Sequence, residues 1–141
     1  MPTIFSRIIS GELPGHFVWR DERCVAFLSI HPLRPGHTLV VTRDEIDHWL
    51  DMDTSLLAHV TSVAHAVGKA IQAAFQPAKV GMMLAGLEVP HVHFHLVPIN
   101  AVHDLDFSNQ DLHAKPEDLA RAADRLRAAL RGLGYKQVAD K

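Results

Sequence analysis

After residue 16, the apolar positions of the first 45 residues gather in three short runs, at residues 17–19, 23–29 and 38–41. The polar segment 20–22 separates the first two runs, and the Pro/Gly-containing segment 32–36 precedes the third. Short apolar runs bounded by turn-forming residues are typical of β-strands. The pattern predicts a β-hairpin that is continued by a third antiparallel strand.

The apolar period then lengthens to that of a helix. Asp53 or Thr54 can cap its start, and Pro77 must end it. The apolar residues between them recur every three or four positions, at Leu56, Val60, Val63, Val67, Ile71 and Phe75. A second helix is predicted over residues 116–131, opened by Pro116. Its apolar stripe consists of Leu119, Ala122, Leu126 and Leu130.

Two further strands are predicted between these helices, at residues 79–85 and 89–99, and residues 100–113 are expected to form an irregular surface loop. A chain of 141 residues with 48% hydrophobic residues is long enough for one domain with a proper core. The expected fold is α+β, with an antiparallel sheet of about five strands, one long central helix and a C-terminal helix.

Composition excludes several classes of partner. The formal charge of −2 and the absence of a Lys/Arg stripe argue against nucleic acid. No signal peptide or apolar run of transmembrane length is visible, so we expect no membrane partner and a cytoplasmic location. The single cysteine, Cys24, excludes an internal disulfide and is expected to be a buried, inert thiol. His59 and His65, six positions apart on the first helix, are expected at the surface.

The most distinctive chemistry lies in the strand over residues 89–99, where His91, His93 and His95 alternate with apolar residues and therefore share one face. Three interpretations are open. The imidazoles can fill a polar patch, which is costly whenever they are protonated. They can ligate zinc with an open fourth position, although a separation of roughly 7 Å between alternate residues makes convergence of all three difficult.

The third interpretation is phosphate chemistry, in which one imidazole attacks phosphorus and a neighbour stabilises charge or protonates the leaving group. His37, in the turn that precedes the third strand, supplies a fourth imidazole. The corner around Gly86 can bring backbone amides near an anionic oxygen. Such a site needs no metal.

The run from His91 to Val97 reads His-apolar-His-apolar-His-apolar-apolar, and it resembles the motif of the histidine triad (HIT) family of nucleotide hydrolases and transferases. Four earlier segments follow the N-terminal half of the family in order, namely residues 3–9, 12–14, 21–27 and 35–41. The resemblance implies a single HIT-like domain over residues 1–141. It also implies a homodimer whose two sheets join into one.

The resemblance further implies roles for individual residues. His93 would be the nucleophile that forms a nucleotidyl intermediate, and His95 would face the scissile bond and the phosphate oxygens. His91 would orient His93 through a hydrogen bond, and His37 would line the phosphate pocket. The positions that sandwich the purine in the family are here Ile4, Phe5, Ile8, Phe27 and Ile30, each of which also suits a plain core.

The expected substrate is a purine nucleotide or nucleotide conjugate, with no cofactor and no metal. The leaving group could be an amine, an amino-acid carboxylate, a sulfate or a second nucleotide phosphate. Two other functions stay open: a nucleotide-sensing module without significant turnover, and a metal-dependent hydrolase that uses the histidine cluster as ligands.

Two departures from the family pattern bear on the substrate. Ser29 stands where many relatives carry an Asp that holds the ribose hydroxyls. The segment 81–88 lacks the family's Asn and Gln amides, and Glu88 takes the place of a Ser or Glu that approaches the leaving group. Phosphate-binding donors are therefore expected to be imidazoles and backbone amides, including the amide of Gly86.

Overall fold

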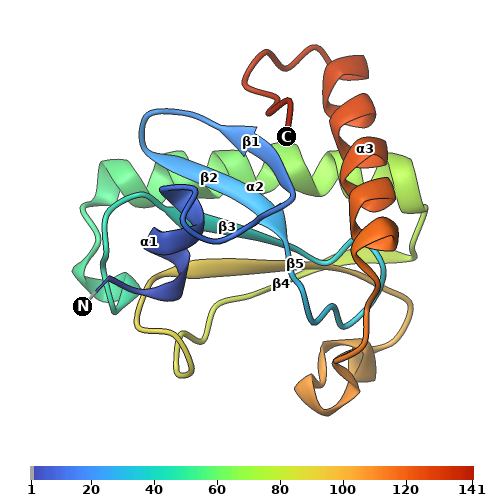
Figure 1. Cartoon of the computed structure of the whole chain (residues 1–141), viewed down its shortest axis with the longest axis horizontal. Helices are drawn as coiled ribbons and strands as arrows, with labels where there is room; N and C mark the ends of the chain where they lie inside the picture. The colour runs from blue at the N-terminus through green and yellow to red at the C-terminus, as the bar shows by residue number, and fades with distance from the viewer. Residues whose placement is uncertain (1) are drawn as a thin grey trace.

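The computed structural model describes residues 2–141, and its centre is an antiparallel sheet with strand order β1-β2-β3-β5-β4 (Figure 1). The strands are β1 (Phe17–Arg20), β2 (Cys24–Leu28), β3 (Thr38–Thr42), β4 (Lys79–Met83) and β5 (His93–Ile99). The fold class predicted from the sequence is confirmed, including the hairpin of β1 and β2 and its continuation by β3.

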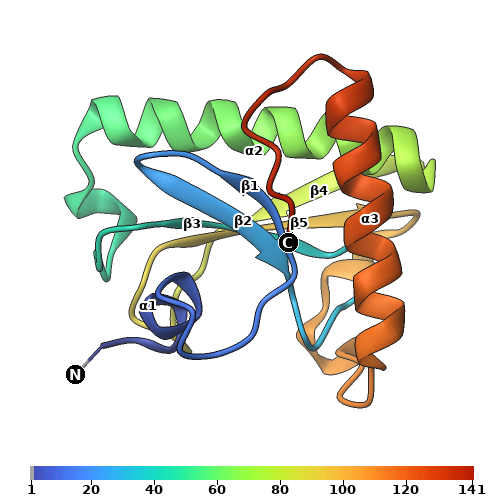
Figure 2. The ribbon, with the colours of Figure 1, turned by 45° about the horizontal axis from the view of Figure 1, so that its top comes forward.

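Helices cover the two faces of the sheet unequally. The long helix α2 (Thr54–Phe75) lies across one face, and α3 (Pro116–Gly132) packs against both α2 and the β1–β2 end of the sheet. The short helix α1 (Ile4–Ile9) lies on the opposite face (Figure 2). The two long helices match the ranges predicted from their apolar periods.

Strand alternation divides the core into two clusters. Val18, Cys24, Ala26, Val40 and Phe94 are buried on the face covered by α2 and α3. A second cluster on the α1 face contains Phe5, Phe17, Val25, Phe27, Leu39 and Val41. The central strands are therefore apolar on both faces, which is why their sequences read as continuous apolar runs. His93 and His95 lie on the same face of the sheet as this second cluster.

The structure corrects several element boundaries. β5 begins at His93, so the strand predicted over residues 89–99 is too long at its start. The His91 amide makes a turn bond to the Val89 carbonyl, and the Val92 amide bonds to the Ile46 carbonyl, so neither enters the ladder. β4 likewise ends at Met83 rather than residue 85.

The segments expected to be irregular contain short helices. The loop over residues 100–113 holds two 3-10 helices, η2 (Val102–Leu105) and η3 (Phe107–Asn109). A third, η1 (Trp49–Asp51), precedes α2, and α1 has no counterpart in the sequence prediction. Within residues 2–141, none of the helices combines the length and apolar character that a membrane crossing requires.

Candidate active site

Two of the three triad imidazoles come from β5 on the α1 face of the sheet. In the pairing with β3, His93 lies opposite Val41 and His95 opposite Leu39. Both partners belong to the cluster on the α1 face. The ring of Phe5, carried by α1, meets the His93 ring edge-on with centroids 4.8 Å apart. The short helix α1 therefore packs against one side of the histidine cluster.

The hydrogen bonds of His93 leave one of its nitrogens available for chemistry. Its Nδ1 lies 2.7 Å from the backbone carbonyl oxygen of His91, so Nδ1–H donates to that oxygen. A neutral imidazole carries one N–H, so Nε2 keeps its lone pair. This tautomer is the one that a nucleophile requires.

His91 is fully buried and lies behind the cavity rather than beside the reacting position. Its Nε2 donates to the Thr42 carbonyl at 2.6 Å, and its Nδ1 accepts from the Thr3 hydroxyl at 2.6 Å. The hydrogen bond that the resemblance implied between His91 and His93 is present, but its acceptor is the main chain of His91. The hydrogen bonds of the His91 imidazole hold that segment of backbone in place.

His37 and His95 form a hydrogen-bonded pair whose direction is set by the main chain. The Leu33 amide donates to His37 Nδ1 at 3.0 Å, so His37 must carry its proton on Nε2. That Nε2–H points at His95 Nδ1, 3.0 Å away. His95 Nδ1 is thus an acceptor, and its own proton lies on Nε2. His95 therefore presents an N–H donor on its remaining nitrogen.

Burial keeps these imidazoles neutral. It lowers the pKa of His37 to about 3, with smaller contributions from His95 and His93. It also lowers the pKa of His95 to about 4, with His93 adding to the effect. The pKa values of His93 and His91 are lowered as well, mainly by burial, although hydrogen bonds to backbone carbonyls oppose the shift. At neutral pH the four rings are uncharged, in agreement with their tautomers.

A cavity of about 330 Å³ opens beside His93 and His95. All eight residues assigned to nucleotide binding by resemblance line it, namely Ile4, Phe5, Ile8, Phe27, Ser29, Ile30, Gly86 and Glu88. His37 and His91 lie behind it and do not line it. The structure thus brings the predicted residues together, while their roles in binding stay predictions.

Other lining residues were not found from the sequence. The Phe107 ring meets the His95 ring edge-on with centroids 5.1 Å apart, and Gln110 lies on the same wall. Both come from the η3 region, which tertiary contacts tie to the turn before β3: the Asp111 amide donates to the Pro32 carbonyl at 3.0 Å, and Arg34 pairs with the buried Asp104. No motif in the sequence marks this segment as part of the site.

The ionisable side chains that line the cavity are His31, Glu88, His93 and His95, and no Lys or Arg is among the lining residues described. Arg34, in the turn before His37, pairs instead with Asp104 at 3.3 Å. Ser29 is half-buried, and its hydroxyl accepts from the His31 amide at 3.3 Å. The cavity is therefore apolar, with neutral imidazoles at its base and one carboxylate on its wall.

The imidazoles do not converge as metal ligands. Within residues 2–141, the one group of three or more His, Cys, Asp or Glu side chains whose ligand atoms lie close enough to share an ion is Asp21, Cys24 and His59. In the histidine cluster, the ring nitrogens of His37 and His91 are both taken by hydrogen bonds.

Comparison with known proteins defines the class of protein to which this fold and site belong. The model of the HIT domain matches residues 10–102, and the chain belongs to the HIT family, whose members are generally nucleotide hydrolases or transferases. The curated relatives include Protein hit of Bacillus subtilis, which is 32% identical over 82% of this chain and 86% of its own length.

Solved structures agree in fold. A HIT-like protein from Bartonella henselae, described as involved in cell-cycle regulation and bound to an unknown ligand, is 31% identical with a TM-score of 0.78. That match covers 90% of this chain and 95% of the other. A hypothetical histidine triad nucleotide-binding protein from Sulfolobus tokodaii is 25% identical with a TM-score of 0.77, over 92% of both chains.

Proposed function

We propose that this protein cleaves the bond between the α-phosphate of a purine nucleoside monophosphate and its leaving group, through a nucleotidyl intermediate on His93. The observation that carries the proposal is the tautomer of His93: Nδ1–H is held by the His91 carbonyl, and Nε2 keeps a lone pair beside the cavity. Membership of the HIT family supports the same class of activity.

The reaction balances as two displacements at phosphorus. In the first, His93 Nε2 forms a bond to the α-phosphorus while the bond to the leaving group breaks, and the departing atom takes up a proton from solvent, which the water of the second step returns. In the second, water attacks the same phosphorus, the P–N bond to His93 breaks, and the water proton is released as the monophosphate departs. Another acceptor in place of water makes the protein a transferase. The neutral His93 is regenerated in either case.

His95 suits the role of a hydrogen-bond donor. Its Nε2–H is available, because its Nδ1 accepts from His37. A proton on His95 Nδ1 would point at the Nε2–H of His37, and the two N–H groups would repel each other. His37 cannot move its proton to Nδ1, because its Nδ1 accepts from the Leu33 amide. His95 therefore stabilises negative charge on a phosphoryl oxygen or on the departing atom by donating a hydrogen bond.

The charge of the cavity favours one type of leaving group. A polyphosphate chain needs cationic partners, and the described lining contains no Lys or Arg. Glu88, at the position that approaches the leaving group in the family, repels further phosphates. A neutral or cationic amine suits this wall. We therefore propose that nucleoside phosphoramidates are better substrates than dinucleoside polyphosphates.

The test is release of nucleoside monophosphate from an adenosine phosphoramidate and from a diadenosine polyphosphate, each with and without a chelator. We expect release of nucleoside monophosphate from the phosphoramidate at the same rate with and without the chelator. His93→Ala should abolish it, whereas His103→Ala should not, because His103 is exposed outside the cavity. Recovery of the His93→Gly variant by added imidazole would assign the nucleophile directly.

The other outcomes identify the alternatives. Nucleotide affinity without product from either substrate supports a sensing module. Loss of activity to the chelator supports a metal-dependent hydrolase. If the polyphosphate turns over faster and His93→Ala still abolishes activity, the mechanism stands, but the proposal that Glu88 disfavours polyphosphates is wrong.

A further inference from the structure

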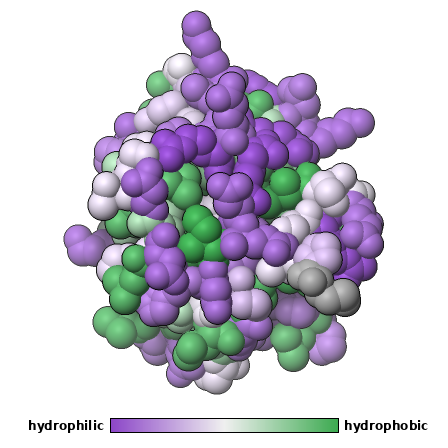
Figure 3. All heavy atoms as spheres, turned by 90° about the vertical axis from the view of Figure 1, so that its left-hand side faces the viewer, coloured by the Kyte–Doolittle hydropathy of each residue, from purple (hydrophilic) through white to green (hydrophobic). Residues whose placement is uncertain are grey.

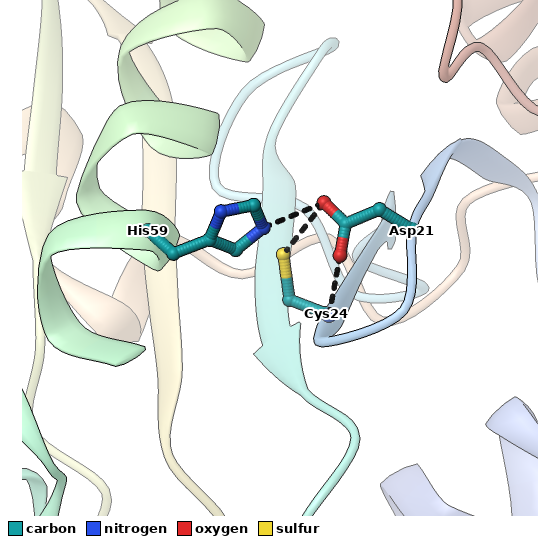
Figure 4. Close-up of side chains that lie close together, drawn as sticks. All are labelled: Asp21, Cys24 and His59. Carbon is teal, nitrogen blue, oxygen red and sulfur yellow. Dashed lines mark hydrogen bonds and ion pairs between the residues drawn. The ribbon is translucent and has the colours of Figure 1, made fainter. Parts of the chain in front are cut away.

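A second cluster of reactive side chains lies away from the cavity, where the β1–β2 turn meets α2 (Figure 4). Asp21 comes from the turn, Cys24 from the first position of β2, and His59 from the second turn of α2. Asp21 Oδ2 lies 2.8 Å from His59 Nε2 and 3.6 Å from Cys24 Sγ. The cluster is on the α2 face of the sheet, whereas the triad is on the α1 face.

The chemistry of these three side chains is that of a zinc site. Thiolate, imidazole and carboxylate are the side chains that ligate Zn²⁺, at about 2.3 Å for sulfur and about 2.0–2.2 Å for nitrogen and oxygen. Tetrahedral bonds of these lengths place two ligand atoms roughly 3.3–3.6 Å apart. The 3.6 Å between Cys24 Sγ and Asp21 Oδ2 falls in that range, and the 2.8 Å between His59 Nε2 and Asp21 Oδ2 is about 0.5 Å short of it. All three ligand atoms lie within 4.8 Å of one another.

The carboxylate is already fixed by other groups. Its Oδ1 accepts the backbone amides of Arg23 at 2.8 Å and Cys24 at 2.9 Å. The indole N–H of Trp19 donates to Oδ2 at 2.8 Å. Partners of this kind orient a ligand before the metal arrives. These bonds also lower the pKa of Asp21 to about 2, against the opposing effect of burial, so the carboxylate is charged at any ordinary pH.

The surface gives an ion access from one side. Cys24 is fully buried, but the side chains of His59 and Asp21 are 32% and 14% exposed. Figure 3 faces the side of the molecule where α2 begins, and hydrophilic side chains cover the upper part of that face. Water can thus complete the coordination of an ion held by three protein ligands.

The charges balance when the site is filled. Metal binding releases the thiol proton of Cys24, and the proton of His59 moves from Nε2 to Nδ1, which leaves Nε2 to ligate. One carboxylate and one thiolate then neutralise the two positive charges of the ion. Two arginines lie nearby: Arg43 donates to the Asp21 carbonyl at 2.6 Å, and Arg23 reaches toward Ser55. Burial and Asp21 raise the pKa of the Cys24 thiol, so the site requires a metal that binds thiolate strongly.

We propose that Asp21, Cys24 and His59 form a Zn²⁺ site that joins the β1–β2 turn to α2. The site is structural in position, since the triad lies on the other face of the sheet. The sequence predicted an inert Cys24 from its apolar neighbours and a surface position for His59 from its spacing to His65, and no spacing motif links Asp21, Cys24 and His59. The fold alone brings them together.

The decisive measurement is titration of the purified full chain with Co²⁺, which substitutes for Zn²⁺ and shows a sulfur-to-metal charge-transfer band when a thiolate ligates it. Cys24 is the only cysteine, so histidine sites elsewhere cannot produce this band. We expect the band at one equivalent of Co²⁺, its loss on addition of Zn²⁺, and a higher Tm with Zn²⁺. No band in the folded wild-type protein would overturn the proposal.

Two variants separate the ligands from the packing. Cys24→Ser keeps a donor to Asp21 and should lose the band entirely. His59→Gln keeps a hydrogen-bonding side chain and should weaken Zn²⁺ binding by at least about 100-fold, the upper range for loss of an outer-shell partner. His65→Gln, on the same helix and exposed, is the matched control and should bind as the wild type does. Equal affinity of His59→Gln and wild type would contradict the assignment of His59, whether or not the band appears.

Discussion

Single backbone groups decide how the imidazoles of the site are protonated. The Leu33 amide and the His91 carbonyl are on the main chain, so side-chain substitutions other than Leu33→Pro leave them in place. Together they direct the proton of His37 toward His95 and hold the Nδ1 proton of His93 away from the cavity. These hydrogen bonds fit the proposed attack by a neutral imidazole, and the pH dependence of activity tests it.

We expect kcat/KM for the phosphoramidate to fall in acid with a midpoint below pH 6.5. The nucleophile is active when neutral, and burial lowers the pKa of His93 below its ordinary value of 6.5. Activity should decline only at more acid pH, as His93 takes up a proton. A pH–rate profile with a midpoint at or above 6.5 would contradict a lowered pKa of His93 in the free enzyme.

Thr3, the N-cap residue of α1, is expected to support the triad through His91. Its hydroxyl donates to His91 Nδ1 and accepts from the Ser6 amide, and the Thr3 amide donates to Glu45. Thr3→Val leaves the buried His91 nitrogen without a partner, which should cost about 1–3 kcal/mol in the free energy of unfolding. Urea denaturation measures the loss. Thr61→Val, on the exposed side of α2, is the control and should change stability by less than about 0.5 kcal/mol.

The turn before β3 determines the position of the His37 side chain. Gly36 has φ +98°, and a Cβ there would lie 2.9 Å from the Phe75 ring of α2. Gly36→Ala should therefore destabilise the protein by more than the roughly 1–2 kcal/mol of a left-handed residue, and it should displace His37. Gly132→Ala is the matched control, because a Cβ there meets nothing within 4 Å. Equal unfolding midpoints for the two variants would contradict this role of the turn.

Elements were predictable from the sequence where a periodic pattern was long or a turn was marked by Pro or Gly. The two long helices satisfy the first condition, and the hairpin satisfies the second. The six-residue α1 is too short to show a period, and its stability comes from the packing of Phe5 on the histidines. The start of β5 was missed because Pro90 and the turn at His91 interrupt a run that alternates perfectly in sequence.

The site was predictable only as far as its motif extends. The residues that the resemblance assigned to nucleotide binding line one cavity, because the motif segments β2, β5 and α1 meet there. Phe107 and the Asp21–Cys24–His59 cluster depend on contacts between segments that no pattern links. The sequence also did not show that the hydrogen bond from His93 goes to the main-chain carbonyl of His91, because residue identity does not determine which atom accepts.

For the whole molecule, buried neutral histidines predict a loss of stability in mild acid. Their folded pKa values lie below the unfolded value of 6.5, so the unfolded chain binds more protons as the pH falls. Stability is complete above pH 6.5 and declines toward pH 4. The pKa of Asp21 is lowered from 3.8, so its effect comes at lower pH. We expect the urea midpoint to fall between pH 7.5 and pH 5, and to fall less in His37→Asn; equal slopes would contradict the assignment to His37.

The homodimer implied by the resemblance to the HIT family has one edge of the sheet available to it. β1 and β4 are the outer strands, but Trp19 of β1 already bridges to Val138. The outer side of β4 has no strand partner among the described residues. Met82 on this strand is 56% exposed, and a groove between β4 and α2 adjoins it. Pairing of two β4 strands would extend the sheet across a two-fold axis and cover this apolar surface.

Met82→Glu tests this arrangement, because a two-fold axis places the two new carboxylates in the same interface. Like charges brought out of water oppose association, so we expect the variant to be monomeric at concentrations where the wild type is dimeric, as measured by light scattering after size-exclusion chromatography. Leu133→Glu introduces the same charge at a residue 46% exposed at the end of α3, and should leave the dimer intact. A wild type that stays monomeric at high concentration, or a Met82→Glu variant that remains a dimer, would rule out β4 as the joining edge.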